Sequence, residues 1–174
     1  MIRSRAETFA LILRAGRGAG LPQGLAEEAA LAAVVALASD PACGPSLVEA
    51  LQAPFDPAGC SVADGTLSVT PSPAAWVAPL IRDALADGVA CVLVQGVDCP
   101  ALLVAGLPGT RMAWRGADCT ITGNPGAGPV RNSGPLTVDQ DTWDTLAALA
   151  ARRLVPETAA SRLSGAGAGG PDAD

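Results

Sequence analysis

The chain has 174 residues, of which 49% are apolar and only 3% aromatic, so one domain with a core of alanine, valine and leucine is expected. The net charge of −6 argues against a nucleic-acid-binding protein, because a phosphate backbone selects a basic surface. All 11 basic residues are arginine, and lysine, histidine and tyrosine are absent. These absences exclude Ser-His and Cys-His nucleophile pairs, imidazole metal sites, lysine Schiff bases and P-loop nucleotide sites.

The first part of the chain, residues 1–53, is predicted to be a helical unit. Ser4 and Glu7 form an S-x-x-E capping box, which predicts a helix that ends near Gly16. A second helix is expected to begin at Pro22, a favoured residue of the first turn, and to end before Pro41. A short third helix is expected over residues 46–52.

The middle, residues 61–134, is predicted to be mainly β. A turn-rich connection over 53–65 precedes a short strand over 66–70, and Pro79 favours a short helix that begins near that residue. Three glycine-bounded apolar stretches predict strands, the last divided at Gly116: residues 88–96, 100–109 and 111–123. Short connections favour antiparallel neighbours, and residues 124–135 read as a loop.

The last part, residues 137–164, is predicted to be helical. Thr137 and Gln140 form a second capping box, and an apolar stripe at helical spacing follows until Pro156. Another short helix is expected after Pro156, and residues 165–174 form a glycine-rich tail. The predicted class is α+β: an N-terminal helical unit, a small mainly antiparallel sheet, and a long C-terminal helix packed on that sheet.

Five cysteines without a C-x-x-C pair indicate a reduced chain with neither a disulfide framework nor a zinc site. Cys99, in "VDCP", is the best candidate for an exposed reactive thiol, although a small buried hydrophobe is the commoner role of a free cysteine. The longest apolar run has ten residues, 29–38, whereas a bilayer-spanning helix needs about 20. No secretion signal is recognisable, so a soluble cytoplasmic protein is expected.

Arginine stands beside glycine at both ends of the chain. In "RAGRGAG", residues 14–20, the glycines do not form the dinucleotide-binding fingerprint and they follow a helix instead of a strand. They fit a helix end and a tight turn, but Arg14 and Arg17 are also suited to hold an anion at the N-terminus of the following helix.

The second such stretch, "SRLSGAGAGG", covers residues 161–170. Its glycines allow successive backbone amides to form an anion-binding nest, and Arg162 is suited to bidentate recognition of a carboxylate or phosphate. The predicted site here comprises Ser161, Arg162, Gly165, Gly167 and Gly169. Disorder is the alternative for a glycine-rich end. Because chain termini commonly lie close together, Arg14, Arg17 and Arg162 are expected to share one surface.

Carboxylates give no comparable pattern. Asp139, Asp141 and Asp144 lie at a predicted helix start, where N-capping accounts for them better than a divalent cation does. Glu27 and Glu28 have no recognisable acid partner for general acid–base catalysis and read as a solvated helix face. Neither a metal nor a cofactor is expected.

Two stretches resemble an uncharacterised bacterial family, a domain of unknown function: "RGAGLPQGLAEEAA" at 17–30 resembles its opening, and "RRLVPETAASRLSGAGAGGPDAD" at 152–174 its ending. That family commonly has aromatic residues in place of Gln23 and Leu154, and asparagine in place of Ala173. The resemblance implies no activity. It does imply that the arginines and glycines at both ends belong to a common pattern, which argues against filler and leaves both an ordered and a disordered tail open.

The sequence favours a non-catalytic binding or accessory protein for a small anionic metabolite or a partner enzyme. The support is the lack of the usual catalytic side chains together with the paired Arg/Gly segments. One alternative is a small enzyme of metabolite catabolism that depends on carboxylates or on Cys99. A second alternative is a structural subunit that associates with copies of itself.

Overall fold

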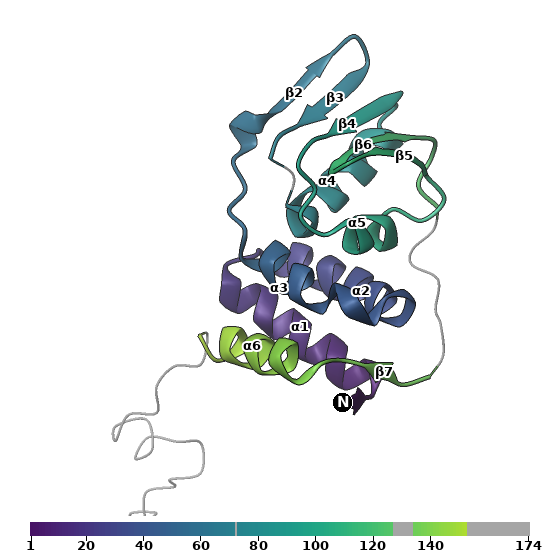
Figure 1. Ribbon diagram of the computed structural model, residues 1–174. Coiled ribbons are helices and arrows are strands. Elements are labelled where there is room, and N and C mark those ends of the chain that lie inside the picture. Colours follow the sequence, from purple (N-terminus) through teal and green to yellow (C-terminus); the bar gives the residue numbers. More distant parts are fainter. Residues whose placement is uncertain (72, 127–133, 153–174) are drawn as a thin grey trace, which may run out of the picture.

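The computed structural model describes residues 1–71, 73–126 and 134–152, and it confirms the α+β class (Figure 1). A five-stranded sheet occupies one end of the molecule. Helices α4 (Ala74–Ala86) and α5 (Pro100–Gly106) lie next to the sheet, α2 and α3 follow, and α1 and α6 lie at the opposite end.

The predicted N-terminal helical unit is confirmed, with boundaries of its three helices corrected. It consists of α1 (Arg5–Ala19), α2 (Gln23–Ser39) and α3 (Gly44–Gln52), with a 3-10 turn η1 (Pro41–Cys43) between the last two. The capping box of Ser4 and Glu7 is present. Helix α1 does not end near Gly16, which is buried against Ala26 of α2. It ends at Ala19 and is capped by Gly20, whose φ of 108° favours glycine.

Helix α2 lies at the centre of the helical layers. It contacts α1, α4 and α5, and consequently it is apolar around most of its circumference. Its buried positions are mostly alanine: Ala26, Ala29, Ala30, Ala32, Ala33 and Ala36. Small side chains allow neighbouring helices to approach closely, which explains how a core with few aromatic residues becomes well packed.

The five-stranded sheet has the order β2-β3-β4-β6-β5. Its strands are β2 (Cys60–Ala63), β3 (Thr66–Val69), β4 (Cys91–Val94), β5 (Arg111–Arg115) and β6 (Asp118–Thr122). Only β3 and β4 pair in parallel, joined by α4; the other neighbours are antiparallel, as predicted. The predicted division at Gly116 is confirmed, since it separates β5 from β6.

Three expectations for the middle of the chain were wrong. Strand β2, which follows a 3-10 turn η2 (Pro57–Gly59), was missed, although Asp64 and Gly65 form its two-residue hairpin turn with positive φ at both positions. Helix α4 begins at Ala74, ahead of Pro79, because the carboxylate of the distant Asp98 accepts a hydrogen bond from the Ala74 amide at 2.9 Å. Residues 100–109 are not a strand but contain α5, which has proline in its first turn.

The C-terminal helix α6 (Gln140–Ala151) is present, but it packs against α1 and α3 and not on the sheet. Its N-cap is Asp139, whose carboxylate accepts a hydrogen bond from the Thr142 amide. The predicted cap Thr137 belongs instead to the short strand β7 (Leu136–Thr137), which pairs with β1 (Ile2–Arg3). The predicted continuation over 153–164 lies outside the described residues.

Candidate functional site: the open face of the sheet

The five-stranded sheet has helices α4 and α5 on one side, and the other side is here called the open face (Figure 1). Side chains alternate between the two sides, as expected for strands. On β4, for example, Val92 and Val94 are buried toward the helices while Leu93 is exposed. The open face is therefore built by every second residue of each strand.

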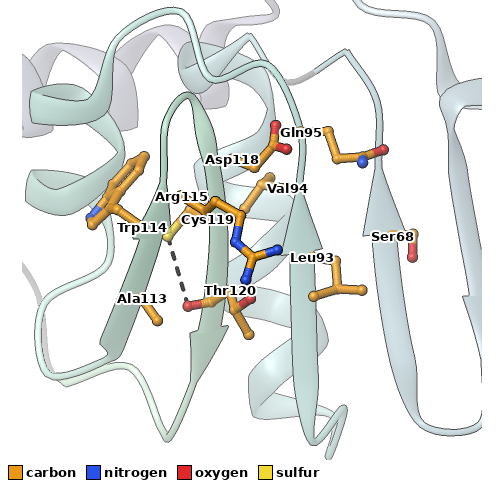
Figure 2. Close-up of a pocket in the computed structure, with 10 residues that line it drawn as sticks. All are labelled: Ser68, Leu93, Val94, Gln95, Ala113, Trp114, Arg115, Asp118, Cys119 and Thr120. Atoms are coloured by element: carbon orange, nitrogen blue, oxygen red, sulfur yellow. Dashed lines mark hydrogen bonds between the residues drawn. The ribbon is translucent and has the colours of Figure 1, made fainter.

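Strand register brings four of these residues into one row. Ser68 pairs with Leu93, Leu93 with Thr120, and Thr120 with Ala113. The short side chains at the two ends of this row leave room above the sheet, and a hollow of about 520 Å³ lies there. Figure 2 shows the residues that line it.

Arg115 supplies the positive charge of this hollow. It is the last residue of β5, next to a two-residue turn in which Gly116 has a φ of 62°, a backbone conformation that suits glycine. Figure 2 shows its side chain extended over the open face toward Thr120 and Leu93. The Arg115 guanidinium makes no hydrogen bond or ion pair with any described residue, so its donors are free to bind a ligand.

Asp118 and Gln95 line the hollow near the β5–β6 turn (Figure 2). Asp118 pairs with Arg115 across the hairpin, and its carboxylate accepts a hydrogen bond from the Gly96 amide at 3.1 Å. The side-chain carbonyl of Gln95 accepts a hydrogen bond from the Thr70 hydroxyl at 2.8 Å. Thr70 and Gln95 directly follow β3 and β4, which are the parallel pair of the five-stranded sheet.

The structure does not place Arg14 and Arg17 near the open face, since α1 lies at the opposite end of the molecule (Figure 1). The Arg14 side chain is exposed, and its Nε donates to the carbonyl of Ala10 one turn earlier in the helix. The Arg17 Nε is buried without a hydrogen-bond partner among the described residues. The predicted partners Ser161, Arg162, Gly165, Gly167 and Gly169 lie outside the described residues.

The glycines of "RAGRGAG" have roles in packing. Gly16 is buried against α2, and Gly20 ends α1. Gly18 lies directly against the backbone of α6, where a Cβ would overlap the carbonyl oxygen of Leu149. Helix contact therefore accounts for Gly16 and Gly18, and the cap at the end of α1 accounts for Gly20. Helix contact also places the end of the described chain, at Arg152, near the end of α1.

Cys99 is not an exposed thiol. Its side chain is 0% exposed, and the Ser46 hydroxyl donates to its sulfur at 3.5 Å. Burial raises the pKa of the Cys99 thiol, so the reactive thiolate is disfavoured. Of the two roles considered for Cys99, the small buried hydrophobe is confirmed and the exposed reactive thiol is wrong.

Asp98, next to this cysteine, gives a pH-dependent stability. Its Oδ2 is buried without a hydrogen-bond partner among the described residues, and burial raises the pKa of the Asp98 carboxyl above its ordinary value of 3.8. The folded protein therefore holds the proton more tightly, and stability falls as pH rises from 3.8 through the raised pKa. Asp98→Asn should keep the acceptor for Ala74 and remove this fall, as measured by urea unfolding between pH 3 and pH 7. Stability curves that run parallel across this range for the wild type and the Asp98→Asn variant would contradict the assignment.

Reasoning from the sequence missed Arg115. The signal was present, because Arg111, Ala113 and Arg115 alternate with Met112 and Trp114, as in a strand with one polar face. The sequence did not show which face of this strand is left uncovered, because the helices that bury the other face come from distant parts of the chain.

Other kinds of site find no support in the part of the chain that is described. Its side chains include no group of three or more carboxylates or thiols placed to hold a metal ion. None of its helices combines the length and the apolar character needed to cross a bilayer. Comparisons of the chain with protein-family models, with curated proteins and with solved structures gave no match.

Proposed function

We propose that the protein is a non-catalytic binding protein for a small anionic metabolite, and that the anion binds on the open face through Arg115. The observation that carries this proposal is a guanidinium with free donors over a hollow of about 520 Å³. A planar guanidinium donates two parallel hydrogen bonds to a carboxylate or a phosphate. The hydroxyls of Ser68 and Thr120 line the same hollow and supply further donors.

The size and chemistry of the hollow define the class of ligand. A volume of this order accommodates a small metabolite. Leu93 is 40% exposed at the centre of the row, so it offers an apolar surface to the body of the ligand. The carboxylate of Asp118 would repel a second negative charge of the ligand. The preferred ligand therefore has one anionic group at Arg115 and a hydroxyl or amide near Asp118.

Among the described residues, none on the open face favours catalysis. A nucleophile would need a neighbouring base, and Cys119, the cysteine next to Thr120, is buried; its sulfur donates to the Thr120 carbonyl at 3.7 Å (Figure 2). Burial also raises the pKa of the Cys119 thiol. Binding without turnover is therefore the function that this geometry supports best.

The test is a titration of the full chain with phosphate, acetate and hydroxy-carboxylates, followed by amide shifts in NMR spectra. Shifts should centre on Gly96 and Gly116. Arg115→Ala should weaken binding by roughly tenfold or more, because a charge-assisted hydrogen bond contributes about 1.5–3 kcal/mol. Arg115→Lys should retain part of the affinity, since it keeps the charge but loses the bidentate geometry.

Arg14→Ala separates this site from the one predicted at the chain ends. It removes an exposed guanidinium at the opposite end of the molecule and should leave the affinity unchanged. A loss in Arg14→Ala with no loss in Arg115→Ala would overturn the open-face proposal and favour the site of Arg14, Arg17 and the C-terminal residues. Light scattering on the same samples tests self-association, which stays a prediction.

A further inference from the structure

Strand β5 forms one edge of the five-stranded sheet. Within residues 1–71, 73–126 and 134–152, no segment pairs with its outer side. An unpaired strand edge presents free amides and carbonyls to any extended chain, and proteins usually block such edges or use them for binding. Four of the five residues of β5 are exposed.

The two faces of β5 have different chemistry. Arg111 and Arg115 lie on the open face, and neither guanidinium has an ion-pair partner among the described residues. Trp114 points to the other face and is 39% exposed. There it lines an apolar hollow of about 340 Å³, whose other walls include Val35, Val104 and Pro108.

We infer that β5 binds an extended segment of a partner protein, which adds a further strand to the sheet edge. Acidic side chains of that segment face Arg111 and Arg115, and an alternate apolar side chain enters the hollow beside Trp114. Strand periodicity requires this alternation, since successive side chains point to opposite faces. Backbone hydrogen bonds supply affinity, and the arginines and the hollow supply specificity.

Charge selects a partner protein over a second copy of this chain. Two β5 strands side by side would bring the arginines of one copy next to those of the other, and like charges on neighbouring strands are destabilising. An acidic segment has the complementary charge. This inference goes beyond the proposed function and does not rest on it, because Trp114 and the strand edge are not needed to bind a small anion.

The experiment uses the full chain and a blocked heptapeptide that alternates glutamate with leucine, followed by NMR shifts of the β5 amides and of the Trp114 indole. We expect shifts confined to β5 and its neighbours. Trp114→Ala should weaken binding at least tenfold, and Arg111→Ala several-fold. If Trp114→Ala does not fold, Val104→Asp serves instead, because Val104 is 50% exposed and an aspartate there puts a negative charge at the hollow.

The controls make each outcome decisive. Val62→Ala lies on the opposite edge strand, where Val62 is 67% exposed, and should bind the peptide normally. A peptide with lysine in place of glutamate should not bind. Shifts at β2, equal binding of the lysine peptide, or no binding of the glutamate peptide would each overturn the inference. If the glutamate peptide does not bind but Arg115→Ala still abolishes phosphate binding, the proposed function stands and only this inference is overturned.

Discussion

Replacing Leu103 by alanine is expected to lower the free energy of unfolding by about 2–5 kcal/mol, because the residue is fully buried and its truncation leaves a cavity. Leu102, its neighbour in the chain, is 1% exposed and should show a loss of the same order. Both residues lie on α5, which packs against α2 and α4. Urea unfolding of the two variants measures the effect.

The adjacent Val104 is the matched control. It is 50% exposed, so Val104→Ala should change the free energy of unfolding by no more than about 0.5 kcal/mol. Large losses of stability at two consecutive positions are the expected result for a helix with a wide buried face. In a strand with one buried face, Leu102 and Leu103 would point to opposite sides and only one would be costly. A large loss at one position alone would argue for the strand that the sequence suggested.

Gly18→Ala is expected to destabilise the protein by roughly 3 kcal/mol, since overpacking of a close contact commonly costs about 1–3 kcal/mol and backbone yields less readily than a side chain. The new methyl group would overlap the carbonyl of Leu149, so α1 and α6 would have to separate. Thermal unfolding followed by circular dichroism would show the loss.

Gly24→Ala is the control for that experiment. Gly24 is also helical, but no heavy atom lies within 4 Å of a Cβ built there. Alanine has the higher helix propensity, so this variant should be unchanged or stabilised by up to about 1 kcal/mol. Equal effects of the two substitutions would mean that Gly18 is not at a helix contact.

Local signals in the sequence predicted much of the fold. The capping box of Ser4 and Glu7, the proline at 22 and the β-branched run in β4 each act over a few residues, and the elements they predict are present. Pro22 is the N-cap of α2 and not a residue of its first turn. The errors occurred where a group distant in the sequence determines the local structure. Asp98 fixes the start of α4 across a gap of 24 residues, and α2 and α4 determine that residues 100–106 are helical.

The candidate site was likewise predicted only as far as local signals allowed. The sequence predicted that arginine and backbone amides bind the ligand, but it pointed to the arginines beside glycine and not to Arg115. Glycine proved ambiguous, because Gly16 and Gly18 serve helix contact and Gly116 serves a hairpin turn. Arg115 could be located only once the sheet showed which of its faces has no helices.

The pairing of β1 with β7 has a consequence for the order of assembly. The amino group of Met1 donates to the carbonyl of Val138, 137 residues later, and α1 then lies along α6. On the ribosome, α1 is made well before α6, which is one of the two helices that pack most extensively against it. The five-stranded sheet, whose strands lie between the two helices in the sequence, can form earlier. A nascent chain truncated before residue 136 should therefore bind chaperones through the uncovered side of α1.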